Sequence, residues 1–353
     1  MNLKTTLLAT LALGVALPAL AAPQEIKLTV GSGHPALSGA VKEIRELFIP
    51  EVDKRLAATG KFKIVWTEAY AGTIAKPPGM LKAVEDGAID VGHVPFLFNG
   101  DKLPLEQITY VTPFGPEDPV KLTEVIKQLR KAVPEMDQQL LKHKQILLAP
   151  LPTDAYQIVA KKPIEKVDDL KGMKLGTAGQ AGNWVRNTGV VSVAGDLTTF
   201  YNSMQTGVYE GIITFDTAVS SYKFYEVAPY ITKVGFGVQY ASGLTVNERR
   251  WKGFPQEVKD AFLAVAPIYE KKVSEYYRDA GEASIKNAVE KGGKVVPFPA
   301  EERGKLAKML PNIAKEWAAE VDKKGLPGSK TLAAYLELCR EAGIPHARAW
   351  DKE

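Results

Sequence analysis

Acidic and aromatic residues stand together at two places where buried segments of the sequence end. Asp154 is two residues from Tyr156, and Asp216 directly follows Phe215. A carboxylate neutralises a positive charge and an aromatic face attracts an ammonium group, so such a set could hold a small amine or amino alcohol. Each acid also has a structural alternative, because Asp216 could cap a following helix and Asp154 could stabilise the preceding turn.

The ends of other predicted strands give further candidates, because ligands of open α/β sheets bind beyond the carboxyl ends of the strands. This rule selects Phe96 and Phe98 after one strand and Thr214 after another, while Tyr70 lies at the end of a third. Phe96 and Phe98 alternate, so they could instead face one core. These positions extend the predicted ligand site across several strands.

No known catalytic pattern is present in the sequence. There is no nucleophile elbow, no HExxH, no Walker loop and no CxxC, and both Gly-x-Gly turns lack the third glycine of a dinucleotide fingerprint. The four histidines occur singly, without a second His or Cys at metal-ligand spacing. We therefore expect no cofactor and no enzyme activity, and a secreted enzyme is the rival class.

Composition is that of an ordinary globular protein of 353 residues, long enough for two domains. A net charge of +4 without a long Lys/Arg run argues against binding to nucleic acid or anionic lipid. Cys339 is the only cysteine, which excludes an intrachain disulfide. It lies in a helical pattern, and we expect it to be a buried small residue.

The first 21 residues have the features of a cleaved export signal. Lys4 is followed by a short apolar core and by the small-x-small site Ala19-Leu20-Ala21. No other segment of the sequence has the length of a membrane span. We expect cleavage after Ala21 and a protein that is free in the periplasm.

Strands and helices alternate along the rest of the chain, which predicts an α/β fold with mostly parallel sheets. The predicted strands include residues 26–30, 62–66, 155–159, 190–193 and 211–214, and the predicted helices include residues 38–58, 78–85, 299–323 and 330–342. Pro50 lies inside the first helical pattern and is expected to kink or split it.

Two segments repeat the order helix, glycine, acidic residue and strand, which suggests two lobes of similar build. Gly87 and Gly207 occupy matching positions where a helix ends and φ must be positive. The chain is predicted to cross between the lobes near residues 148–152 and 235–245, giving a hinged cleft. The expected divisions are residues 1–21, the signal peptide; 22–150 with about 236–254, the first lobe; 151–235 with the C-terminal helices, the second lobe; 255–291, a lobe-bridging helix; and 292–353, a C-terminal helical region.

The segment from Val167 to Thr177 resembles a motif of the solute-binding proteins of tripartite ATP-independent periplasmic (TRAP) transporters. The family pattern reads roughly Asp-Leu-Lys-Gly-Leu-Lys-Ile-Arg, and the stretch Met204–Gly211 resembles the family's Leu-Gln-Thr-Gly-Val-Val-Asp-Gly. Such matches occur in the same order as in the family, and together they cover nearly the whole chain. The resemblance implies the two-lobed fold of a type II-like periplasmic binding protein of the C4-dicarboxylate-binding type. It also implies a receptor that delivers a small-molecule solute to integral-membrane TRAP permease subunits, without nucleic acid, and we expect a monomer.

One departure from the family pattern concerns the ligand itself. Gly176 stands where the family has the arginine that grips the carboxylate of an organic acid, and Thr177 and Trp184 flank this position. Arg–carboxylate pairs are bidentate contacts that glycine cannot make. An organic acid held by another Lys or Arg stays the first expectation, and a small cationic or neutral polar solute is the alternative.

Overall fold

The structure, a computed structural model, describes residues 22–353 as an α/β molecule in which ten strands are joined in one connected sheet. The main strand order is β2-β1-β3-β9-β4-β7-β5-β6, with β8 joined to β4 and β10 joined to β8. The strands are β1 Gln24–Ser32, β2 Phe62–Ala69, β3 Val91–Pro95, β4 Gln145–Ala160, β5 Lys174–Thr177, β6 Val191–Ala194, β7 Gly211–Phe215, β8 Tyr230–Lys233, β9 Val238–Asn247 and β10 Lys294–Pro297.

Two sheet sections share the long strand β4, and we call them the first and second lobes. In the first lobe, β1 pairs in parallel with β2 and β3, and β9 lies antiparallel between β3 and the start of β4. In the second lobe, β5 pairs in parallel with β6 and β7, and the end of β4 runs antiparallel to β7 and β8. The expected mixed, mostly parallel sheet is therefore confirmed, with β4 and β9 as its antiparallel members.

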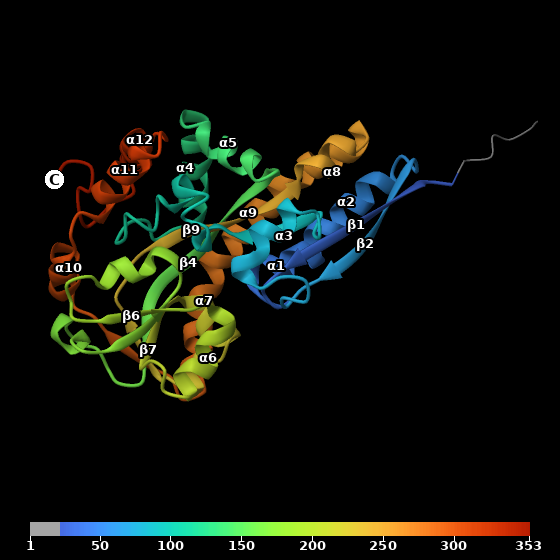
Figure 1. The fold of residues 1–353 in the computed structure, drawn as a ribbon. Coiled ribbons are helices and arrows are strands. Elements are labelled where there is room, and N and C mark those ends of the chain that lie inside the picture. Colours follow the sequence, from blue (N-terminus) through green and yellow to red (C-terminus); the bar gives the residue numbers. More distant parts are fainter. Residues whose placement is uncertain (1–21) are drawn as a thin grey trace, which may run out of the picture.

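Helices cover both faces of the sheet (Figure 1). The helices are α1 Gly39–Glu43, α2 Ile49–Ala57, α3 Met80–Glu85, α4 Pro119–Ala132, α5 Glu135–Lys142, α6 Leu197–Gln205, α7 Asp216–Ser221, α8 Glu248–Gly253, α9 Gln256–Glu290, α10 Ala300–Met309, α11 Ile313–Lys323 and α12 Gly328–Glu341.

Pro50 does interrupt the regular helix that the sequence predicts over residues 38–58. A π-helical turn, Ile44–Phe48, separates α1 from α2, and Pro50 is the second residue of α2. Proline has no amide hydrogen to donate to the carbonyl four residues earlier, so the preceding turn widens. Phe48 is fully buried in the core between this helical segment and α9.

The 35-residue helix α9 is the predicted brace, and it continues through Pro267. It packs against α1 and α2 of the first lobe, along β4, and against α7 of the second lobe. Figure 1 shows it running from the blue part of the chain to the yellow part. One helix thus contacts both lobes. Gly87 and Gly207 each have φ of +79°, as their positions at helix ends required.

The sequence was misleading at one place. The single helix predicted for residues 299–323 is two helices, α10 and α11, because Pro311 cannot continue a helix and the chain turns at Leu310. The predicted crossing with Pro150 and Pro152 lies inside strand β4, which pairs in both sheet sections. Register shifts beside Pro152 accommodate the missing amide donor.

Candidate ligand-binding site

A pocket lies between the two lobes, where strands of both sheet sections end. The first lobe contributes His34 after β1 and Phe98 after β3, and the second contributes Phe215 at the end of β7 and Tyr222 just after α7. Tyr277 of α9 closes one side. The cavity volume is about 70 Å³, several times the roughly 10–15 Å³ that one water molecule needs. The space suits a small solute with an apolar part.

The pocket wall carries no formal charge. Among the described residues that line it there is no Asp, Glu, Lys or Arg. Its ionisable side chains are two histidines and three tyrosines, and burial raises the pKa of each tyrosine: Tyr156, Tyr222 and Tyr277. All three tyrosines therefore stay neutral at ordinary pH.

His34 and His93 form the polar end of the pocket, with ring centroids 5.7 Å apart. Burial lowers the pKa of His34 to about 4, a shift that the charge of Asp196 opposes, and lowers that of His93 to about 3. Both imidazoles are therefore neutral near pH 7, and each has one nitrogen that donates and one that accepts.

Neighbouring hydroxyl groups hold the two imidazoles in place. His93 lies between two serines, with Nδ1 3.2 Å from Ser32 Oγ and Nε2 3.0 Å from Ser242 Oγ. Nδ1 of His34 is 3.2 Å from the hydroxyl of Tyr222, which belongs to the other lobe. This contact joins the lobes at the pocket wall.

Thr214 presents a hydrogen-bonding group with no partner of its own. It is 1% exposed, lines the pocket from β7, and its Oγ1 has no hydrogen-bond partner within the described chain. A buried hydroxyl without a partner costs free energy. A polar atom of a bound solute would satisfy it.

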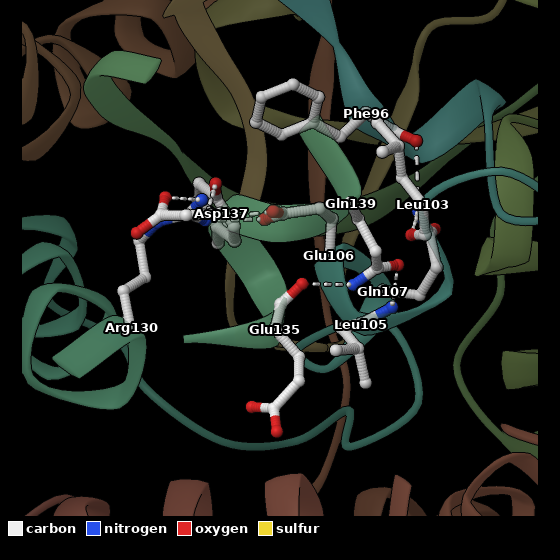
Figure 2. A network of polar contacts seen from close by, with 10 residues as sticks. Phe96, Leu103, Leu105, Glu106, Gln107, Arg130, Glu135, Asp137 and Gln139 are labelled. Carbon is white, nitrogen blue, oxygen red and sulfur yellow. Dashed lines mark hydrogen bonds and ion pairs between the residues drawn. The ribbon is translucent and has the colours of Figure 1, made fainter. Parts of the chain in front are cut away.

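A buried polar network supports the first-lobe wall of the pocket (Figure 2). Nε2 of Gln107 donates to the carbonyl oxygen of Phe96 at 2.9 Å, at the start of the short 3-10 helix Phe96–Phe98. In the same network Arg130 donates to both oxygens of Glu106 at 2.9 Å and to Asp137 at 2.5 Å. The bond from Gln107 holds the segment that carries Phe98 into the pocket, and the bonds of Arg130 hold Glu106, the residue before Gln107.

The structure brings four of the ten predicted site residues to the pocket wall: Phe98, Tyr156, Thr214 and Phe215. Phe96 instead packs into the core, with its ring edge-to-face against Tyr240. Trp184 lies behind Tyr156, 5.3 Å between ring centroids, and its Nε1 donates to the carbonyl oxygen of Tyr110.

Three further predicted residues with hydroxyl or carboxyl groups also lie outside the pocket lining. Thr177 contacts Ser192, with 2.7 Å between their Oγ atoms, and Tyr70 lies just beyond β2. Asp154 accepts hydrogen bonds from the backbone amide and hydroxyl of Thr217. Burial, followed by the charge of Asp216, raises its pKa well above the ordinary value.

Asp216 is engaged in an ion pair and does not line the pocket. Its Oδ2 accepts from Nζ of Lys233 at 2.7 Å. Burial raises the pKa of Asp216, an effect that Lys233 opposes. Asp216 is also the first residue of α7 rather than the cap before it, and no side-chain cap bond is formed there.

Gly176 lies in β5, next to the second-lobe wall. A Cβ atom built on it would be 2.7 Å from the ring of Tyr209 and 3.1 Å from Ile212. Arg186, which follows in the same region of the chain, pairs with Glu316 on the surface instead of acting as a clamp. No arginine of the described chain takes over the position of a clamp within the pocket lining.

Reasoning from the sequence missed the histidines because it sought neighbours in sequence. His34 and His93 are far apart along the chain, but β1 and β3 are adjacent parallel strands, and Ser32 is paired with His93. The strand-end rule, applied to β1, would have selected His34, whereas His93 lies in the middle of β3 and only the pairing with β1 brings it to the same place. The rule also misses Phe200, which reaches the pocket from α6.

Other kinds of site find no support in residues 22–353. No group of three or more His, Cys, Asp or Glu side chains in this range is arranged to hold a metal ion. Within the same range, no helix is both long and apolar enough to cross a membrane. Cys339 is free and fully buried, which confirms the prediction of a buried small residue.

Comparison with protein families and curated proteins gives consistent matches. The model of the bacterial extracellular solute-binding protein family 7 matches residues 34–320. A solute-binding protein of Albidiferax ferrireducens is 24% identical over 249 residues, which are 67% of this chain and 71% of the relative.

Solved structures share the fold. An extracytoplasmic solute receptor of Bordetella pertussis that binds pyroglutamic acid is 21% identical, with a TM-score of 0.76 over 88% of this chain and 99% of the receptor. A TRAP solute-binding protein of Rhodoferax ferrireducens in complex with copurified benzoate is 15% identical, with a TM-score of 0.80 over 90% and 98% of the two chains. These proteins are receptors and not enzymes. Fold, interlobe pocket and family match agree, and the chain belongs to bacterial extracellular solute-binding protein family 7, the solute receptors of TRAP transporters.

Proposed function

We propose that this chain is a TRAP receptor for a small uncharged solute, which it binds between its lobes and delivers to the membrane permease. The observation that carries the proposal is the absence of any formal charge among the described residues of the pocket wall. The solute would place an apolar body against Phe98 and Phe215. Its polar groups would reach Thr214 and His34, because both ring nitrogens of His93 already contact serine hydroxyl groups.

Electrostatics favours a neutral ligand in such a pocket. An ionised carboxylate or ammonium group that leaves water loses several kcal/mol of solvation, which only a partner charge or a full set of hydrogen bonds offsets. Neutral histidines and hydroxyl groups give moderate hydrogen bonds, with a net value of about 0.5–1.5 kcal/mol each. They suit a carbonyl, amide or alcohol group better than an ion.

The two charged alternatives meet specific obstacles. A cationic solute would need a carboxylate in the pocket wall, but neither Asp154 nor Asp216 lines the pocket, and Asp216 is already paired with Lys233. An organic acid, such as those bound by the related receptors, would need a cation, and Gly176 supplies none. The family resemblance still makes an organic acid the alternative to test.

The remaining features of the proposal concern location and assembly. We propose that residues 1–21 direct export and are removed, which leaves a monomer in the periplasm. The lobe divisions expected from the sequence would make β4 and β9 the segments about which the cleft opens. Partners would then be one solute and the integral-membrane permease subunits.

A matched series of probes tests the charge of the ligand. Benzoate, benzamide and benzamidine have similar shapes and carry charges of −1, 0 and +1 at neutral pH. We expect benzamide to bind most tightly of the three by calorimetry at pH 7.5. A thermal-shift screen of small amides, alcohols, acids and amines then extends the comparison beyond aromatic probes.

A second measurement identifies the natural solute directly. Protein purified from its native host is denatured, and the released molecules are analysed by mass spectrometry in both ionisation modes. An uncharged solute supports the proposal. A copurified carboxylate that also binds more tightly than its amide would contradict it, and so would chemical conversion of the bound solute.

A further inference from the structure

The ring of Tyr209 fills the space beside Gly176 on one face of β5. A Cβ atom at position 176 would lie 2.7 Å from both Cε2 and Cζ of this ring, closer than real Cβ atoms approach. Tyr209 is 2% exposed, so the ring belongs to the packed core of the second lobe. Any side chain at position 176 must displace it.

A second glycine, Gly195, lies beside the hydroxyl end of the same ring. A Cβ atom at Gly195 would lie 3.2 Å from the hydroxyl oxygen of Tyr209 and 2.7 Å from the ring of Phe200. Phe200 and Tyr209 pack edge-to-face, with 6.0 Å between their centroids. The tyrosine is therefore held between two glycines and one aromatic neighbour.

This packed group adjoins the pocket. Phe200 lines the pocket, and so does Ala178, which follows Gly176 by two residues in extended backbone. Residues two apart in a strand point to the same side. A long side chain at position 176 would therefore extend from the place of the Tyr209 ring toward the pocket wall at Ala178 and Phe200.

We infer that Tyr209 is a specificity-determining residue of this receptor, an inference that rests on the proposed uncharged ligand. Its ring occupies the route by which a charged side chain on β5 would reach the solute. It also supports Phe200, which presents an apolar surface there. Gly176 and Tyr209 act as a pair, so a cation at position 176 requires a smaller residue at position 209.

The steric part of the inference is tested by stability alone, without a ligand. We compare Gly176→Ala, Tyr209→Val and the double variant by thermal unfolding. We expect Gly176→Ala to lower Tm in the native background and to lower it much less in the Tyr209→Val background. Gly253→Ala is the control, because its Cβ has no neighbour within 4 Å, and its effect should be the same in both backgrounds.

The specificity part uses Gly176→Arg with and without Tyr209→Val, titrated with benzoate and benzamide. We expect a gain in benzoate affinity of roughly 10-fold or more in the double variant only, because a charged hydrogen bond contributes about 1.5–3 kcal/mol. Gly176→Gln with Tyr209→Val has a long but uncharged side chain and should show no such gain. Benzamide affinity should not rise in parallel.

The outcomes separate this inference from the proposed function. Equal effects of Gly176→Ala in both backgrounds would overturn the pairing, and so would a gain in benzoate affinity from Gly176→Arg alone. A folded double variant that binds benzoate no better than the native protein would refute the role in specificity. Preference of the native protein for benzoate over benzamide would instead refute the uncharged ligand, whatever the stability comparison gives.

Discussion

Two neutral histidines make the polar end of the pocket sensitive to acid. The pKa values of His34 and His93 are lowered by burial to about 4 and about 3, whereas a histidine in an unfolded chain titrates near 6.5. As pH falls from about 6.5 to about 4, the unfolded chain binds protons that the native protein does not. The two buried histidines therefore leave the unfolding free energy at its full value above pH 6.5, and this free energy falls progressively as the pH drops below 6.5.

We expect His93→Gln to flatten this dependence. Each unit by which a pKa is lowered corresponds to about 1.4 kcal/mol, so the native protein should lose more unfolding free energy between pH 7 and 4.5 than the variant. Urea denaturation at several pH values measures the difference. Buried acids such as Asp154 and Glu106 titrate with the opposite sign, but they are common to both proteins. Identical pH profiles would show that His93 is not the acid-sensitive group.

The ion pair of Arg130 and Glu106 should matter far more than the pairs on the surface. Both side chains are buried, with 7% and 0% exposed. Burial raises the pKa of Glu106, while the charge of Arg130 opposes that effect. Arg130→Met leaves a buried carboxylate without its counter-charge, and we expect a loss of about 3–5 kcal/mol of unfolding free energy.

An exposed pair provides the comparison for Arg130. Arg186 and Glu316 are 41% and 51% exposed, so Arg186→Met should change unfolding free energy by less than about 1 kcal/mol. Urea denaturation gives both values. Losses of similar size in the two variants would mean that the buried network does not stabilise the pocket wall as its contacts suggest.

Sequence reasoning located part of the site because strand ends are visible in a sequence. Thr214 and Phe215 are the last two residues of β7, Phe98 lies just beyond β3, and all three line the pocket. Asp216 also follows a strand. Its carboxylate is paired with Lys233 of β8, which lies 17 residues later in the chain, so it does not face a solute. Pairing between distant segments cannot be read from one segment, and the charge of the pocket depends on such pairing.

The bounds of a helix could be predicted where one apolar periodicity continued along its whole length. The apolar stripe of α9 is long enough to outweigh Pro267, so its bounds could be predicted within a residue or two. The helical pattern of residues 299–323 concealed the break at Pro311, since apolar residues lie on both sides of it. The ladder of β9 with β3 and β4 could not be predicted, because antiparallel partners far apart in sequence leave no local signal.

A glycine in α9 marks where this helix touches the region between the lobes. A Cβ atom at Gly281 would lie 3.1 Å from Oδ2 of Asp154, whereas one at Gly304 in α10 has no neighbour within 4 Å. Alanine is favoured over glycine in a helix by up to about 1 kcal/mol. We expect Gly304→Ala to raise Tm and Gly281→Ala to lower it, in a matched thermal-unfolding comparison. A clear rise in Tm for Gly281→Ala would show that α9 does not pack tightly over Asp154.

At the scale of the whole molecule, the contact between His34 and Tyr222 links the lobes across the pocket. Tyr222→Phe removes the hydroxyl group but keeps the ring, which stacks on Phe224. The loss of one hydrogen bond, about 0.5–1.5 kcal/mol, should shift the ligand-free protein toward an open form. We expect a larger radius of gyration by small-angle X-ray scattering.

The control for this change is Tyr201→Phe. The hydroxyl of Tyr201 bonds to Glu226 within the second lobe, so its removal should leave the radius of gyration unchanged. An unchanged radius for Tyr222→Phe as well would mean that the contact between His34 and Tyr222 does not hold the lobes together.

The position of Trp184 allows its fluorescence to report the binding of a solute. Its fully buried indole stacks on Tyr110 and packs edge-to-face against Tyr156, which lines the pocket. A solute that displaces water at Tyr156 alters the surroundings of this indole, so its fluorescence spectrum should follow occupancy. Subtracting the emission of Trp184→Phe removes the light of the other four tryptophans. Rapid mixing could then time the arrival of an unlabelled solute.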